Sequence, residues 1–97
     1  MAVEWKYKRV DLADDLTTIE ASACLVNGLY VNTALSAHVC EIKDDTSSVY
    51  SLIASLAAGS RVEFGPTIFA TKLIVDPDNA ATGSITVEYV LLGEPHG

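Results

Sequence analysis

Basic residues are scarce in this chain. Lysine and arginine together number 6, against 13 aspartates and glutamates, and the formal net charge is -7. A surface of that sign repels phosphate backbones, so nucleic-acid binding is not expected. No apolar stretch approaches the roughly 20 residues of a membrane-spanning helix, and the amino terminus lacks the apolar core of a signal peptide. We therefore expect synthesis in a cytoplasm and no membrane partner.

Proline, glycine and cysteine are also few. Three prolines and six glycines are too few for a low-complexity or disordered chain when 49% of the residues are hydrophobic. A length of 97 residues allows one compact domain with one modest core. The two cysteines, Cys24 and Cys40, do not make a disulfide framework, and we predict that both are buried free thiols.

Motifs that carry chemistry are missing as well. The two histidines, His38 and His96, are not accompanied by a nucleophile elbow, so we assign no catalytic residue and expect no enzyme. His38 and Cys40 share a strand face but lack the paired spacing of a zinc site. The loop 76–83 begins like a calcium loop but lacks the glycine and glutamate expected at the sixth and twelfth positions. We assign no cofactor and no metal, and leave a weak cation site in this loop open.

Alternation of apolar and polar residues is the dominant pattern that is present. Short extended segments recur at intervals of roughly 8–12 residues, as in an antiparallel sandwich or barrel. Residues 49–58 fit a strand or a short helix, and we predict a strand through about Ile53. Gly65-Pro66 is expected to end a strand. The extended segments are 5–10, 17–20, 25–33, 37–43, 49–53, 61–64, 67–70, 71–75 and 84–92, and we count seven or eight strands among them.

Seven to eight short strands predict an all-β fold, either a small antiparallel β-sandwich or a barrel-like jelly roll. A turn near residues 32–36 is expected to pair 25–33 with 37–43 as a hairpin, a register in which Cys24 misses Cys40. The segment 25–33 is apolar on both faces, which predicts cover on each side or an oligomer contact. We therefore expect a homo-oligomer, with a trimer as one arrangement.

The amino-terminal segment is the most informative one. Trp5, Lys6, Tyr7, Lys8 and Arg9 contain three of the six basic residues and the only tryptophan. Aromatic and arginine side chains dominate interface hot spots, so we predict that these five residues bind a partner. The alternative is an edge strand whose lysines only prevent aggregation.

Charge and composition then divide the chain into three parts. The first nine residues carry three bases and one acid, a net +2, and the remaining residues carry three bases and twelve acids, a net -9. We expect a basic arm or edge strand over residues 1–10, a β-sandwich domain over 11–92 and a flexible tail over 93–97.

Three strings between residues 25 and 89 share a common texture of strands and turns. They are GLYVNT at 28–33, AAGS followed by VEF within 57–64, and LIVD leading through ATG to ITVEY within 73–89. Together they resemble the small all-β virion proteins of tailed bacteriophages, of the head-decoration and minor structural type. The resemblance covers about two-thirds of the chain and implies an often oligomeric β-sandwich that works by attachment. It carries over no functional residue, and the basic segment departs from it.

We therefore predict a virion structural protein, a capsid decoration or cement protein that binds the outside of the shell and stabilises it. Its partner would be the major capsid protein or another virion protein. A tail, neck or fibre component is one alternative. A carbohydrate-binding or adhesion module is another, with Trp5, Tyr30 or Tyr50 as the ring that stacks on a sugar.

Overall fold

The computed structural model describes residues 5–13 and 16–92. This part of the chain forms eight β-strands: β1 (Lys6–Asp11), β2 (Thr17–Glu20), β3 (Cys24–Thr33), β4 (Cys40–Asp44), β5 (Ser47–Ile53), β6 (Arg61–Phe69), β7 (Leu73–Pro77) and β8 (Ser84–Leu91). Within these residues, no helix has the length and apolar character needed to cross a bilayer.

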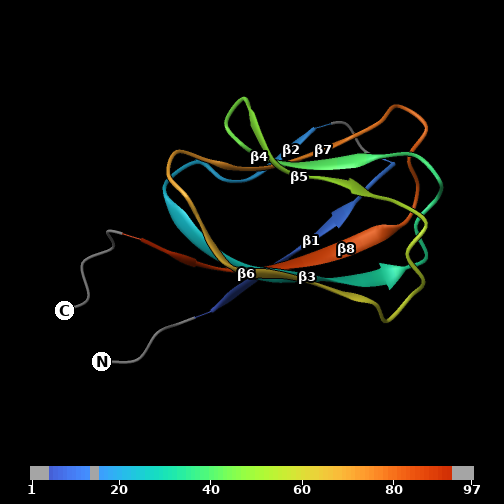
Figure 1. The fold of residues 1–97 in the computed structure, drawn as a ribbon, viewed down its shortest axis with the longest axis horizontal. Coiled ribbons are helices and arrows are strands. Elements are labelled where there is room, and N and C mark those ends of the chain that lie inside the picture. The colour runs from blue at the N-terminus through green and yellow to red at the C-terminus, as the bar shows by residue number, and fades with distance from the viewer. Residues whose placement is uncertain (1–4, 14–15, 93–97) are drawn as a thin grey trace.

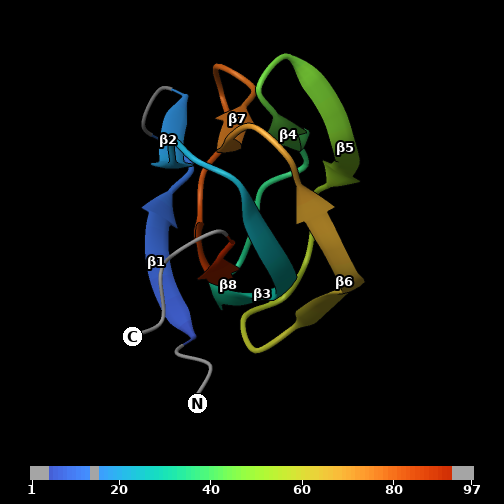
Figure 2. The same cartoon turned by 90° about the vertical axis from the view of Figure 1, so that its left-hand side faces the viewer.

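The strands form two four-stranded antiparallel sheets that pack face to face (Figure 1). Sheet A has the order β1-β8-β3-β6, and sheet B has the order β2-β7-β4-β5. Figure 2 shows β1 and β2 along one side of the sandwich and β6 and β5 along the other. The predicted antiparallel β-sandwich is confirmed, in the form of two separate sheets.

The core lies between the sheets and is built by alternation along the strands. Each sheet turns one apolar face inward, as the period of two along a strand requires. The largest fully buried side chains are Phe69, Leu12, Leu29, Ile42, Leu73, Ile85, Val26, Val75 and Val87. Burying them supplies the main stabilisation of a domain of this size.

The predicted hairpin between 25–33 and 37–43 is wrong. β3 lies between β8 and β6 in sheet A, and β4 lies between β7 and β5 in sheet B. The connection crosses between the sheets because Leu35 is buried in the core, and its amide donates a hydrogen bond to the Leu56 carbonyl. Cys24 and Cys40 therefore lie in different sheets, and both are buried free thiols, as predicted.

A β-bulge in β3 explains why this strand is apolar on both faces. Val26 pairs with Tyr89 and Gly28 pairs with Glu88, so one β3 residue is extra between them. The extra residue shifts the alternation, so that Val26 and Leu29 both point into the core. A covering partner is not needed to account for the pattern, although Leu25 and Tyr30 remain on the outer face.

The prediction that Gly65-Pro66 ends a strand is also wrong, because β6 continues through both residues. Glu63 pairs with Gly28 and Thr67 pairs with Val26, so three β6 residues lie opposite one β3 residue. Gly65 has a φ of 85°, which residues with a side chain rarely adopt. Proline is tolerated because β6 is an edge strand, where one row of N–H groups has no partner to bond.

Residues 47–53 form β5, which confirms a strand through Ile53. The preceding polar turn bends at Asp45, whose φ is 56°. Beside it, the Asp44 carboxylate accepts backbone hydrogen bonds from Ala70, Thr71 and Lys72 at 2.8, 3.0 and 3.1 Å. Asp44 thus fastens the β6–β7 connection to the end of β4.

Candidate functional site

The amino-terminal segment forms an edge strand of sheet A, one of the two forms expected for it. Lys6 pairs with Tyr89 and Lys8 pairs with Val87, and both partners are buried in the core. Paired residues of antiparallel strands point to the same side, so the two lysines lie on the core side of the sheet, at its open edge. Charged side chains that point inward at an edge also hinder pairing with another strand.

Tyr7 and Arg9 lie on the opposite, outer face of sheet A. Tyr7 is 59% exposed, and Arg9 donates from Nη2 to Ser84 Oγ at 3.3 Å, beside a shallow pocket of about 180 Å³. Trp5 is 37% exposed, and the alternation of the strand places it on the same side as Tyr7. The structure therefore divides the five predicted binding residues between two surfaces.

The six basic side chains of the chain fall into two groups. Three of them form ion pairs with carboxylates: Lys43 with Asp76 and Glu41, Arg61 with Glu63 and Glu88, and Lys72 with Asp45. The other three, Lys6, Lys8 and Arg9, have no ion pair within the described residues and all lie on β1. We call these three residues the basic edge.

A polar network centred on Glu88 occupies the middle of the outer face of sheet A. The Glu88 carboxylate accepts hydrogen bonds from the Asn27 amide and, at 3.3 Å, from Arg61 Nη2. The hydrogen bond from Asn27 is the main reason that the pKa of Glu88 is lowered, and bonds from Tyr7 and Arg61 add to it. The hydrogen bond between Tyr7 and Glu88 also raises the pKa of the Tyr7 hydroxyl.

Arg61 of this network also contacts an aromatic ring. Its guanidinium carbon lies 4.4 Å from the ring centroid of Tyr30, a cation–π contact, and it is also bonded to Glu63. Gly28 makes the arrangement possible, because a Cβ there would lie 2.5 Å from the Val62 carbonyl oxygen and 3.2 Å from Arg61 Nη2. Sequence reasoning missed this network, since its members come from four strands and no spacing links them.

Apolar side chains cross the same face next to the network. Leu25 pairs with Val90 on one side and with Ile68 on the other, and all three alternate with core residues. Continuing the β1–β8 register places Trp5 beside Val90. We call Trp5, Val90, Leu25 and Ile68 the apolar row. Ile68 is 62% exposed, so no described segment covers that end of the row.

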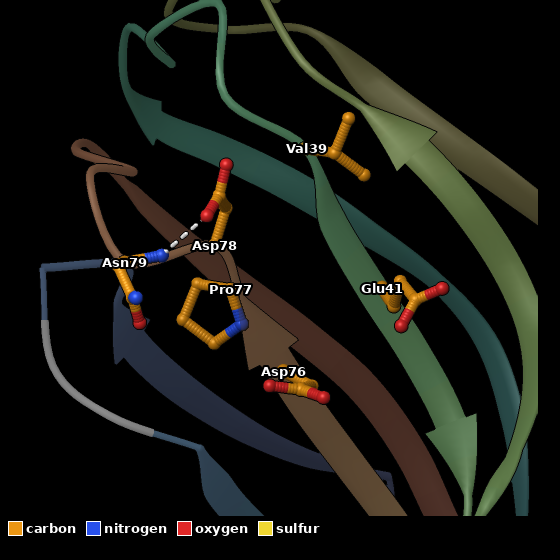
Figure 3. Close-up of a pocket in the computed structure, with 6 residues that line it drawn as sticks. All are labelled: Val39, Glu41, Asp76, Pro77, Asp78 and Asn79. Atoms are coloured by element: carbon orange, nitrogen blue, oxygen red, sulfur yellow. Dashed lines mark hydrogen bonds between the residues drawn. The ribbon is translucent and has the colours of Figure 1, made fainter.

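The outer face of sheet B has a different character. A pocket of about 310 Å³ lies where β4 and β7 meet the loop after β7 (Figure 3). Its polar lining includes Glu41, Asp76 and Asp78. The Lys43 ammonium lies 2.7 Å from Asp76 Oδ2, and this hydrogen bond is the main reason that the pKa of Lys43 is raised.

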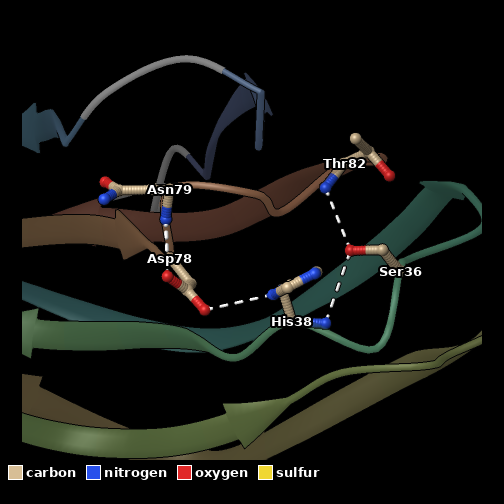
Figure 4. Close-up of polar contacts among 5 residues, drawn as sticks. All are labelled: Ser36, His38, Asp78, Asn79 and Thr82. Carbon is tan, nitrogen blue, oxygen red and sulfur yellow. Dashed lines mark hydrogen bonds and ion pairs between the residues drawn. The ribbon is translucent and has the colours of Figure 1, made fainter.

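His38, considered for catalysis and for zinc, contacts Asp78 of the pocket lining. Its Nδ1 is 3.2 Å from Asp78 Oδ2, and the Ser36 hydroxyl accepts the amide hydrogens of His38 and Thr82 (Figure 4). These bonds join the β3–β4 and β7–β8 connections. His96 and the predicted tail lie outside the described residues.

Two other kinds of site considered from the sequence were a metal site and a reactive thiol. Across residues 5–13 and 16–92, no group of three or more histidine, cysteine, aspartate or glutamate side chains is placed to hold a metal ion, the loop 76–83 included. Burial raises the pKa of the Cys24 thiol to about 11 and that of Cys40 to about 12. A thiol of that pKa is almost fully protonated at neutral pH and is a poor nucleophile or ligand.

Of the residues considered for sugar stacking, Tyr30 has one ring face covered by Arg61, and the side chain of Tyr50 lies outside the described part of the structure.

Comparison with known proteins adds no identification: no family model, no curated protein and no solved structure matches the chain.

Proposed function

We propose that the protein is a structural subunit that attaches to a larger assembly through the basic edge of β1. The observation that carries the proposal is the division of the basic residues. Lys43, Arg61 and Lys72 form ion pairs, whereas Lys6, Lys8 and Arg9 form none within residues 5–13 and 16–92. On a chain of net charge -7, this strand can orient the molecule toward an acidic surface.

The resemblance to small virion proteins of tailed bacteriophages supports a virion as that assembly. We propose a capsid decoration protein, made in the host cytoplasm and carried on the virion, whose bound copies bridge shell subunits and add buried interface. A tail, neck or fibre component is the other virion role consistent with attachment. The two roles differ in copy number, because a shell offers many equivalent sites and a tail or neck offers few.

The first test is the composition of virions of the phage that encodes the chain. Quantitative mass spectrometry is expected to find the protein at a fixed ratio to the major capsid protein. A few copies per particle would move the assignment to the tail or neck. Absence from the virion would overturn it, and binding to free glycans that is lost in Trp5→Ala would favour the carbohydrate-binding alternative.

The second test separates docking from edge protection. The double variant Lys8→Glu/Arg9→Glu should weaken binding to emptied shells by about tenfold or more, which corresponds to about 1.4 kcal/mol. Lys72→Glu, a single charge reversal on the β6–β7 connection, is the control and should bind normally. Rising salt should weaken the wild-type complex as well. If the double variant binds like the control, the lysines of β1 serve only to protect the edge.

A further inference from the structure

A small polar pocket lies on sheet A at the end of β1. We propose that this pocket binds a neutral sugar residue of a glycan, and that the neighbouring ring of Tyr7 stacks on the next part of the glycan chain. The pocket has a volume of about 180 Å³, which is the share of about six water molecules in the liquid. It is lined by Arg9, Asp11, Thr33, Gly83 and Ser84.

The buried hydroxyl of Ser84 orients the polar groups of the pocket. Ser84 is 4% exposed, and its Oγ accepts a hydrogen bond from Arg9 Nη2 at 3.3 Å and donates one to Thr33 Oγ1 at 3.0 Å. Because Thr33 Oγ1 accepts this hydrogen, its own O–H can donate to a ligand. Most N–H groups of Arg9 also have no partner within residues 5–13 and 16–92. The pocket therefore holds oriented donors before any ligand arrives.

The backbone beside the pocket is fixed by Gly83. Its φ is 107°, and a Cβ there would lie 2.7 Å from the Ala34 carbonyl oxygen and 2.8 Å from Leu35 Cδ2, so only glycine fits. The Gly83 carbonyl accepts a hydrogen bond from the Leu12 amide at 2.9 Å. These contacts hold the β7–β8 connection against the ends of β1 and β3, so the wall of the pocket is preformed.

The balance of charge in the lining identifies the class of ligand. Asp11 lies two residues after Arg9 on the same face of β1, and its Oδ1 accepts the Ala13 amide hydrogen at 3.0 Å. A guanidinium group only donates hydrogen bonds, and an ionised carboxylate only accepts them. Asp11 repels an anion and Arg9 repels a cation. A neutral group with hydroxyls satisfies both side chains, because each hydroxyl donates and accepts.

An exposed aromatic ring distinguishes a sugar from other neutral hydroxyl compounds. Tyr7 lies two residues before Arg9 on the same face, about 7 Å along the strand. Its side chain is 59% exposed, and its hydroxyl is bonded to Glu88, which restrains the ring. The C–H side of a sugar ring is apolar and packs on such a ring, while its hydroxyls reach polar groups. A glycan can therefore use Tyr7 and the pocket together.

The sugar site shares Arg9 with the basic edge but differs from it in two respects. Lys6 and Lys8 point to the other side of β1, so a bound sugar leaves both lysines accessible. Binding of a neutral sugar should also be insensitive to salt, whereas attachment through the basic edge weakens as salt rises. The sugar site does not depend on which assembly the basic edge contacts.

The test is a titration of the full ¹⁵N-labelled chain with linear trisaccharides of glucose, mannose and galactose, followed by NMR. At least one trisaccharide is expected to bind in the millimolar range, with equal affinity at low and high salt. The amide signals that shift should be those of the site: Tyr7, Arg9, Asp11, Thr33 and Ser84.

Uncharged substitutions then locate the sugar. Thr33→Val removes a donor and should weaken binding of that trisaccharide by about two- to tenfold. Thr71→Val, at an exposed threonine on the β6–β7 connection, is the matched control and should bind normally. Tyr7→Leu removes the aromatic ring and should weaken binding by a similar factor, whereas Tyr7→Phe keeps the ring and should retain most of the affinity. Thermal melting checks that each variant folds.

Three results overturn the proposal: no trisaccharide binds, the shifted signals lie on another surface, or Thr33→Val or Tyr7→Leu binds normally. Affinity that is lost in Trp5→Ala while Thr33→Val binds normally is one such result, and it would assign the sugar to another ring. Thr33→Val changes no charge and should bind emptied shells normally. Sugar binding without shell binding keeps this inference and overturns the attachment, and the reverse result keeps the attachment alone.

Discussion

The two outer faces of the sandwich are built on sheets of equal strand number, yet they differ in chemistry. On sheet A, apolar side chains form a row beside a network in which Arg61 pairs with Glu63 and with Glu88, and the Glu88 side chain is only 10% exposed. On sheet B, Lys43 also pairs with two carboxylates, Glu41 and Asp76, but these are 36% and 30% exposed. A buried carboxylate depends on its hydrogen-bond donors more than a carboxylate that water can also solvate.

The largest expected difference between the faces is in stability. Glu88→Ala leaves the half-buried Asn27 amide and the Arg61 guanidinium without their shared acceptor, and we expect a loss of about 1–3 kcal/mol in the free energy of unfolding. Asp76→Ala on sheet B leaves Lys43 near Glu41 and water, so its loss should be smaller. Urea unfolding of both variants measures the two values. Equal losses would show that the networks contribute alike.

A smaller effect is expected in the dependence of stability on pH. Hydrogen bonds lower the pKa of Glu88, mainly from Asn27, and that of Asp44, mainly from the Lys72 amide. A carboxylate with a lowered pKa in the folded state stabilises the fold fully above its unfolded value, 4.5 for glutamate and 3.8 for aspartate. That contribution is lost as the pH falls through the folded pKa.

Thermal melting between pH 7 and pH 2 should therefore show a flat region and then a decline below about pH 4.5. Glu88→Gln and Asp44→Asn should each make the decline shallower, because each variant removes one titrating group. A decline as steep as that of the wild type in both variants would assign the acid sensitivity to other carboxyl groups.

The smallest difference is expected in thiol reactivity between the inner faces, where each sheet has one cysteine. Cys24 of sheet A and Cys40 of sheet B are both fully buried, with thiol pKa values raised to about 11 and about 12. A thiol reagent at pH 8 should react with neither in the native protein and with both in denaturant. Cys24→Ser and Cys40→Ser, measured separately, assign the rates. Rapid native labelling of one cysteine would show that its sheet opens locally.

The strands and turns were largely predictable, because alternation and turn residues act over a few neighbours. The segments 17–20 and 84–92 and the turn before β5 are close to those in the structure. The β3 bulge was not predictable, since the pairing of Val26 with Tyr89 and Gly28 with Glu88 depends on strands far away in the chain. The crossover at Leu35 was missed for the same reason: a leucine in a turn becomes informative only once a core is present to bury it.

The candidate site shows the same division. The sequence identified residues 5–9 as a basic, aromatic segment, but alternation alone cannot say which side of a strand faces a core. Pairing with β8 placed Lys6 and Lys8 at the open edge and Tyr7 and Arg9 on the outer face. The Glu88 network collects residues from all four strands of sheet A, and no local signal marks it.

By itself, the sequence determined an acidic, single-domain, all-β chain with its unusual concentration of positive charge at the amino terminus. Hydrophobic periodicity and composition are properties of the chain and need no partner strand to be read. The tertiary structure alone decided which basic residues form ion pairs and which apolar side chains lie on an outer face. Those properties depend on the register between distant strands, where a shift of one residue moves every side chain to the other face.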